Sequence, residues 1–230
     1  MRLFTAVPRS IRSGCAVLGL VLLLLAPATA LGLDQPGEPR QRLTAKDNRR
    51  AASVVVRKSD LFASYRVDAT GGALPSIPHC DAYPGDRSGI TITGSARAGF
   101  TNGGSTIGSA GIFFKNQLSL EAYWRATVRT EYATCFAELY AKGRREGVVA
   151  ETLEAGPTRI GPTGATRVAA YRVVTRLSAE GSRTFDWYQT IVFVNSGRGL
   201  AIIRVASADH ACDCFTGLAT DAARRLRAAR

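Results

Sequence analysis

Histidine is scarce in this sequence, which contains only two in 230 residues. Imidazole is the side chain most often used as a general base near neutral pH and as a metal ligand, so its scarcity removes most familiar catalytic and zinc-binding arrangements. Lysine is also scarce, with four against 26 arginines. The glycine-rich stretch Gly99–Thr106 is not followed by the lysine of a phosphate-binding loop. We interpret this stretch as a hairpin turn.

Recognisable catalytic constellations are lacking as well. The nearest approach to a serine-hydrolase nucleophile elbow is Ile107–Gly111 (IGSAG), which lacks the first glycine and lies in a predicted strand. Glu151 and Glu154 lie three apart on another predicted strand, which places their carboxylates on opposite faces. We therefore predict that the protein is not an enzyme, that it has no catalytic residue and that it binds no cofactor.

Long apolar runs are absent except near the N-terminus, where Cys15–Ala26 contains 12 residues without a polar side chain other than the thiol. A membrane-spanning helix needs about 20. Three arginines and no acidic residue precede this run, and Ala28–Ala30 supplies the small residues of a cleavage site. We predict a signal peptide over residues 1–30, a secreted or other extracytoplasmic location, and no stable membrane span after cleavage. A retained N-terminal anchor is the alternative.

Acidic residues are outnumbered, with 18 against 30 basic ones, and the formal net charge is +12. Removal of residues 1–30 would leave +9. Outside the cytoplasm such a charge would favour anionic partners, for example acidic envelope polymers, and the predicted compartment argues against nucleic acid. The arginines are scattered over the predicted elements, so a solvated basic surface is the alternative interpretation.

The remaining sequence predicts a flexible linker over residues 31–47, rich in proline and polar side chains, and one globular domain over residues 48–230. Its fold class is α+β, with a mostly antiparallel sheet of about six strands covered by a central amphipathic helix and a C-terminal helix. Period-two and helical spacings place these elements as follows: a short helix from Asn48, strands at Ile90–Thr93 and Ser105–Phe114, a helix between Asn116 and Gly143, strands at Val148–Leu153, Thr166–Leu177, Thr184–Val194 and Leu200–Ala206, and a helix carrying Phe215, Leu218, Ala222 and Leu226.

Four cysteines follow the predicted signal peptide: Cys80, Cys135, Cys212 and Cys214. An even number in an exported chain indicates disulfides, and four cysteines allow three pairings. We favour Cys80–Cys135, which would tie the irregular stretch Asp68–Gly89 to the central helix. A Cys212–Cys214 bridge is possible but would close a strained ring.

The alternative for this corner is a metal or redox site. Within six residues, the segment Asp209–Cys214 contains His210, Cys212 and Cys214. Thiolate and imidazole are ligands for soft metals, yet the segment lacks the paired spacing of zinc sites. We predict no metal and keep these three residues as the candidates if one binds.

A family resemblance rests on the Arg57–Leu61 turn (RKSDL), Cys80, a strand hairpin ending at Phe113–Phe114, Trp124 and Cys135. In these features the chain resembles exported actinobacterial proteins of unknown function. Its element order is similar to the extracellular sensor domain of mycobacterial serine/threonine kinases and to the wider PsbP/Mog1-like sandwich. In those proteins the Asp-Leu pair is usually followed by Pro-x-Gly-Trp, whereas this chain has Phe62–Tyr65 (FASY).

The resemblance implies a sensor-like, non-catalytic domain that binds an envelope ligand or a protein partner, and it carries over no ligand-binding residue. A cleft between the Asp68–Gly89 stretch and the last strands is the expected place for a ligand. Aromatic side chains on those strands could line it or fill the core: Tyr171, Phe185, Trp187, Tyr188 and Phe193. An electrostatic binder of anionic polymers and a metal or redox protein remain the alternatives.

Overall fold

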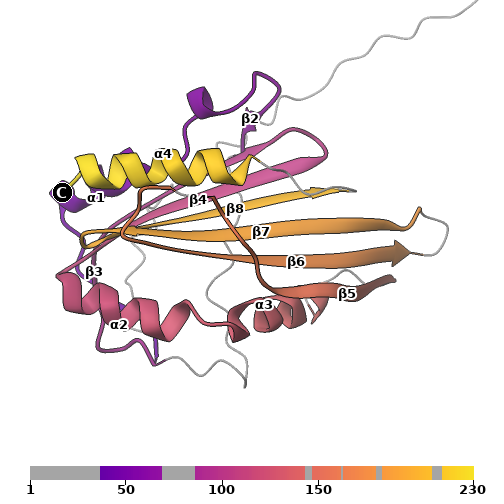
Figure 1. Cartoon of the computed structure of the whole chain (residues 1–230), viewed down its shortest axis with the longest axis horizontal. Helices are drawn as coiled ribbons and strands as arrows, with labels where there is room; N and C mark the ends of the chain where they lie inside the picture. The colour runs from indigo at the N-terminus through magenta and orange to yellow at the C-terminus, as the bar shows by residue number, and fades with distance from the viewer. Residues whose placement is uncertain (1–36, 69–85, 143–146, 162, 180–182, 209–213) are drawn as a thin grey trace, which may run out of the picture. The chain divides into compact units, whose positions relative to one another are not determined.

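The computed structural model describes residues 37–68, 86–142, 147–161, 163–179, 183–208 and 214–230 (Figure 1). These residues belong to one compact unit, residues 34–230. No helix in this described part is both long and apolar enough to span a membrane. The predicted signal peptide lies outside the described residues.

One eight-stranded sheet organises the fold, in the order β1-β3-β4-β8-β7-β6-β5 with β2 paired to β3. All pairings are antiparallel except that of β1 with β3. The predicted α+β class is confirmed, but the predicted number of about six strands is wrong. The two extra strands have two residues each, too short for any period to show. The strands are β1 Arg40–Gln41, β2 Arg66–Val67, β3 Thr91–Thr101, β4 Ser105–Phe114, β5 Val148–Pro157, β6 Arg167–Ala179, β7 Phe185–Ser196 and β8 Gly199–Ala208.

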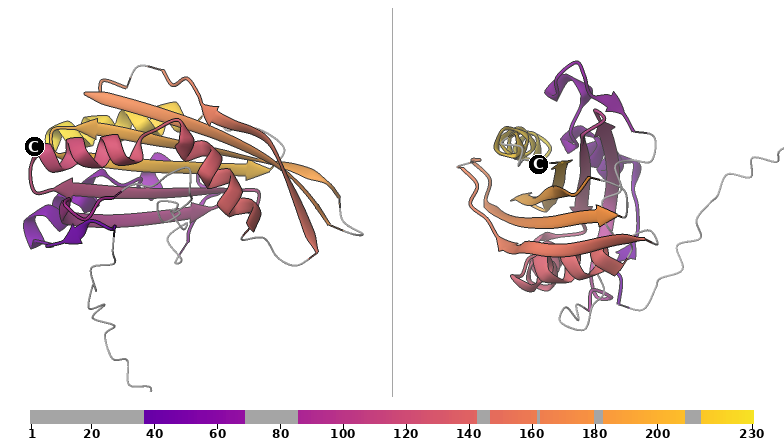
Figure 2. Two further views of the ribbon diagram at one scale, coloured as in Figure 1. Left: turned by 90° about the horizontal axis from the view of Figure 1, so that it is seen from below. Right: turned by 90° about the vertical axis from the view of Figure 1, so that its right-hand side faces the viewer.

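Two helices cover each face of the sheet. Helices α1 (Ala45–Val54) and α4 (Phe215–Ala228) lie on one face, and α2 (Gln117–Thr127) and α3 (Glu131–Lys142) lie on the other (Figures 1 and 2). The central strand β7 serves both cores. Its even-numbered Val192 and Val194 pack with α1 and α4, and its odd-numbered Ile191 and Phe193 pack with α2 and α3. We call these the aliphatic face and the aromatic face.

The predicted central helix is in fact two helices, so the prediction of one continuous element is wrong. Helix α2 ends at Thr127, and α3 begins at Glu131. The β-branched pair Thr127–Val128 has low helix propensity, and the break lets the chain change direction. Helix α2 contacts β4, whereas α3 contacts β5 and β6.

The first helix starts earlier than predicted, and it lies directly on the sheet. Thr44 caps α1, accepting a hydrogen bond from the Asp47 N–H at 3.2 Å, so part of the segment predicted as a linker is structured. A Cβ added to Gly94 would collide with the backbone of Asp47, and one added to Gly111 would collide with that of Ala51. These two glycines allow α1 to rest on the backbones of β3 and β4.

A buried ion pair fixes this helix to the β7–β8 turn. The carboxylate of Asp47 accepts hydrogen bonds from both terminal nitrogens of Arg198, at 2.6 and 2.9 Å, and from the Thr93 hydroxyl at 2.6 Å. The hydrogen bond from Arg198 is the largest effect on the pKa of Asp47, which lies far below its usual value. The first turn of α1 is thereby held against the sheet.

Candidate functional site

A groove opens on the aliphatic face, between α4, strand β4 and the segment that follows α1. Its volume is about 220 Å³. The segment contains a short 3-10 helix, η1 (Lys58–Asp60), and leads into β2; it lies beside α4 in both views (Figure 1; Figure 2, right). The groove is lined by Asp60, Leu61, Phe62, Tyr65, Ile107, Cys214, Gly217, Leu218 and Asp221.

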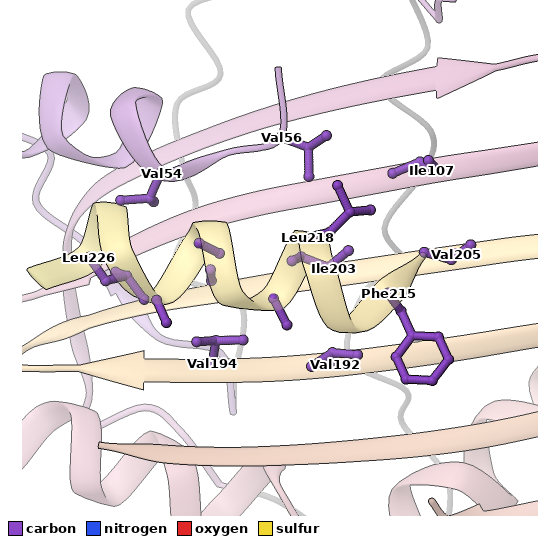
Figure 3. Close-up of a cluster of buried hydrophobic side chains, with 14 of the residues drawn as sticks. Val54, Val56, Ile107, Val192, Val194, Ile203, Val205, Phe215, Leu218 and Leu226 are labelled. Atoms are coloured by element: carbon purple, nitrogen blue, oxygen red, sulfur yellow. The ribbon is translucent and has the colours of Figure 1, made fainter. Parts of the chain in front are cut away.

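The floor of the groove is apolar and belongs to the core. Ile107 is 1% exposed and Leu218 is 5% exposed. Figure 3 shows Leu218 on α4 beside Ile107 and Ile203 of the strands, all members of one buried cluster. Helix α4 presents no side chain at Gly217, where an added Cβ would meet nothing within 4 Å. Glycine inside a helix is less favourable than alanine by about 1 kcal/mol, so this position keeps the groove open at a cost in helix stability.

The rim of the groove exposes a large apolar side chain. Phe62, which lines the groove, is 79% exposed. The backbone below Phe62 is nevertheless held, because the Lys58 ammonium donates to the carbonyl oxygens of Phe62 and Ala63 at 2.9 and 3.0 Å. A large exposed aromatic next to an apolar pocket is typical of an interaction site.

An ion pair fastens the segment to α4. Asp60 receives two hydrogen bonds from Arg225, at 2.6 and 2.8 Å, and a third from the Arg57 N–H at 2.7 Å. Burial is the largest effect and raises the pKa of Asp60, but the hydrogen bonds from Arg225 and Arg57 outweigh it and leave this pKa below its usual value. Arg225 also donates to the Val55 carbonyl at 3.0 Å. Asp60, the less exposed of the two carboxylates in the lining, therefore stays ionised and is already paired with a cation.

Tyr65 closes the other end of the segment. Its ring is 7% exposed, and its hydroxyl lies 2.8 Å from that of Ser105 at the start of β4. With Asp60–Arg225 at one end and Tyr65–Ser105 at the other, the segment is anchored at both ends. Phe62 lies between the two anchors.

The cysteines are placed only in part. Cys135 and Cys214 are disulfide-bonded. Cys135 packs on the aromatic face and Cys214 against the aliphatic core, and a disulfide requires Cα atoms within about 7 Å, so these two do not pair with each other across the sheet. Cys80 and Cys212 lie outside the described residues. The favoured Cys80–Cys135 pairing and the possible Cys212–Cys214 pairing stay predictions.

The candidate metal and redox corner is likewise only partly described. His79 and His210 lie outside the described residues, as does Cys212. Cys214 directly precedes α4 and lines the groove. Within the described ranges, no three potential metal-ligating side chains come together. The metal or redox alternative stays a prediction.

Two other motifs considered in the sequence have clear structural positions. Ser109 is fully buried, and its hydroxyl accepts a hydrogen bond from the Val56 N–H at 3.1 Å, which gives it a structural role beneath α1. Glu151 pairs with Arg176 and Glu154 with Val174, with a register shift between Thr152 and Glu154. The predicted opposite orientation of the two carboxylates is therefore wrong, because the irregularity turns both to one face; both are exposed to solvent.

The aromatic residues of the meander divide between core and surface. Tyr171 and Phe193 are 4% and 1% exposed and pack edge to face at 6.1 Å between ring centroids. Burial, with a smaller effect of Glu131, raises the pKa of Tyr171 to about 12. Phe185, Trp187 and Tyr188 are partly exposed.

Little in the sequence predicts the groove. Gly217 interrupts the helical pattern of the C-terminal segment, and an isolated glycine in a helix often marks a packing or functional position. Asp60 and Leu61 belong to the turn on which the family resemblance rests, but the resemblance assigns them no role in binding. The expected cleft beside the Asp68–Gly89 stretch cannot be compared, since residues 69–85 lie outside the described part of the chain.

Comparisons with known proteins give a distant structural likeness. No family model matches the chain, and no curated protein matches it. The chain is similar to the extracellular domain of PknH from Mycobacterium tuberculosis, with a TM-score of 0.41 and 10% identity over 84% of this chain and 98% of that one. It is also similar to LpqN, involved in cell envelope biogenesis in Mycobacterium tuberculosis, with a TM-score of 0.30 and 12% identity over 72% of this chain and 76% of that one.

The resemblance to a mycobacterial kinase extracellular domain is confirmed as a structural likeness. The wider PsbP/Mog1-like assignment stays a prediction. A likeness at these TM-scores assigns no ligand and no function to this chain.

Proposed function

We propose that this protein is a non-catalytic, extracytoplasmic binding domain whose groove beside α4 takes an apolar group of an envelope ligand or of a partner protein. The observation that carries the proposal is the combination of an open apolar groove at Gly217 with the exposed Phe62 at its rim. A folded chain that holds both features exposes apolar surface that a partner can cover.

The chemistry of the lining supports binding rather than catalysis. Asp60 is held by Arg225, and Cys214 is disulfide-bonded. Asp221 is paired with Arg224 at 2.6 Å. What the groove offers to a ligand is therefore mainly apolar surface. An apolar cavity of about 150 Å³ accepts benzene, so a groove of about 220 Å³ fits one aromatic ring or a short stretch of alkyl chain.

Filling the groove tests this proposal. The probe is N-phenyl-1-naphthylamine, a neutral fluorophore that brightens in apolar sites and is not attracted by the basic surface. Gly217→Leu should weaken its binding at least about tenfold, because the new side chain occupies the open space. Gly217→Ala is the matched control and should weaken it less. Equal binding to wild type and Gly217→Leu would refute the groove as the site.

The rim gives a second comparison. Phe62→Ser removes an exposed aromatic at the groove, and Leu118→Ser removes a side chain that is 77% exposed on α2, on the opposite face. The first should weaken probe binding and the second should leave it unchanged, as followed by fluorescence titration. If both act alike, the probe reports general surface hydrophobicity.

The net charge of +12 supports a second candidate, an electrostatic binder of anionic envelope polymers. Such binding should fall steeply as salt is added, because screening shortens the range of exposed charges. Binding in the groove should change little with salt. A titration of heparin, used as a generic polyanion, at low and high salt separates the two candidates.

A further inference from the structure

Three side chains on the aromatic face have buried polar atoms without a hydrogen-bond partner. Gln189 on β7 is fully buried, and within the described part of the chain neither its amide oxygen nor its amide nitrogen is paired. The same holds for the hydroxyl of Thr175 on β6, which is 1% exposed, and for the buried indole nitrogen of Trp187. Buried polar groups in native proteins are rarely left unpaired, and those that are need an explanation.

The strand register brings these groups together. Thr175 lies directly opposite Trp187 in the β6–β7 pair, and Gln189 follows two residues later on β7. Residues opposite one another or two apart on a strand share a face, with neighbouring Cβ atoms about 5 Å apart. All three lie on the aromatic face, because Ile191 and Phe193 continue the same row. They are therefore separated from the groove by the sheet.

The row of these side chains reaches the surface at one end. Trp187 is only partly buried as a residue, as is Phe185 two positions before it on the same side of β7. Gln189 is the deeper member of the row, with Ile191 behind it at 1% exposure. The polar atoms themselves are buried, so a ligand would reach them from the Trp187 end of the row.

The hydrogen-bonding capacity of the three side chains selects the ligand. The indole and the amide nitrogen donate, the amide oxygen accepts, and the threonine hydroxyl does both. A carboxylate or phosphate only accepts, so it would leave the Gln189 oxygen without a donor. Hydroxyl groups donate and accept, and they match the set.

The register also places the charged side chains of the neighbouring strands. Arg204 points to the same face, because it pairs with Ile191 on β7. Among the described residues of these strands, Glu151 and Asp186 both pair with Arg176, which follows Thr175 directly on β6 and therefore lies on the other face. No acidic side chain of β5, β6 or β7 is in the same row to satisfy the donors.

We propose that Thr175, Trp187 and Gln189 form a second binding site, on the face opposite the groove, for the hydroxyl groups of a carbohydrate. The site is independent of the function proposed for the groove, and either can fail without the other.

The first test uses stability without any ligand. If the Gln189 amide and the Thr175 hydroxyl are unpaired in the ligand-free protein, Gln189→Leu and Thr175→Val should each raise the melting temperature, by roughly 2–4 °C. Sites kept for binding are commonly stabilised when their polar groups are removed. A lower melting temperature for both variants would show that the groups are paired structurally, and would overturn the proposal.

The second test measures binding. Trp124→Phe leaves Trp187 as the only tryptophan, since the chain has two, so its emission reports on the site. Titration with glucose, mannose, galactose and N-acetylglucosamine should give a saturable change with at least one sugar. Affinity should fall at least about tenfold in Gln189→Leu and in Thr175→Val made in this background, because a site built on hydrogen bonds loses them.

Controls make either result decisive. Gln117→Leu removes an exposed glutamine on α2 that bonds Glu121, and Gly217→Leu fills the groove; both should leave the sugar response unchanged. Acetate serves as an acceptor-only probe and should give no response. Saturation by acetate alone, or no saturation by any of the four sugars, overturns the proposal; in the second case the unpaired atoms are met by water.

Discussion

The two faces of the sheet are stabilised by different interactions. On the aliphatic face, α1 and α4 pack small and branched side chains, and two ion pairs hold the flanking segments: Asp47–Arg198 and Asp60–Arg225. On the aromatic face, the rings of Tyr132, Tyr171 and Phe193 contact one another. Polar groups are paired where the groove lies and unpaired at the end of the aromatic face. The two candidate sites should therefore respond to different substitutions.

The largest expected effect on stability comes from a substitution in the core of the aromatic face. Phe193 is 1% exposed and packs edge to face on Tyr132 at 5.2 Å. Phe193→Ala should lower the free energy of unfolding by about 3–5 kcal/mol, because it leaves a cavity. Urea titration measures this loss. Binding of the naphthylamine probe should persist below the unfolding transition; its loss would mean that the groove depends on the opposite face.

The next largest effect is expected from removal of the Asp47–Arg198 ion pair on the aliphatic face. Arg198→Ala leaves Asp47, whose side chain is 8% exposed, without its main partner. The expected loss in the free energy of unfolding is about 3 kcal/mol. Arg224→Ala is the matched control, because it removes an arginine that is 66% exposed in its pair with Asp221, and it should cost less than about 1 kcal/mol. Similar losses for the two variants would contradict a special role for Asp47.

Acidic pH should lower the stability that the ion pairs of the same face provide. The pKa values of Asp47 and Asp60 are lowered in the folded protein, so their contribution is fully present above their unfolded pKa, about 4, and is lost as the pH falls through the folded values. Thermal unfolding followed between neutral pH and acid should show this decrease. Arg198→Ala should make the stability depend less on pH, since Asp47 then has a pKa closer to its unfolded value. An unchanged slope would place the acid sensitivity elsewhere.

The smallest effect has the opposite sign. Gly217→Ala should raise the free energy of unfolding by about 1 kcal/mol, because alanine is the better helix former and the added Cβ meets nothing within 4 Å. Urea titration would detect the gain. Together with weaker probe binding, it would show that stability is given up to keep the groove open. A loss of stability would indicate a contact that the open space does not suggest.

Regular elements were largely predictable from local patterns. Strand patterns predicted β5 and the meander of β6, β7 and β8, and helical spacing predicted α4, because each element has a side-chain period fixed by its own backbone. The break after Thr127 was not predicted, because Leu120 and Phe136 keep an apolar pattern across it, and the packing of α2 and α3 against different strands leaves no trace in that pattern.

By itself, the sequence determined the fold class, the order of the long elements and the basic charge, all of which follow from composition and local periodicity. The candidate binding surfaces, in contrast, could be located only from tertiary contacts. The groove joins Phe62, Ile107 and Gly217, which are far apart along the chain, and the polar row depends on the register between β6 and β7. Contacts between distant segments leave no period in the sequence, because each segment is compatible with many partners until the sheet has formed.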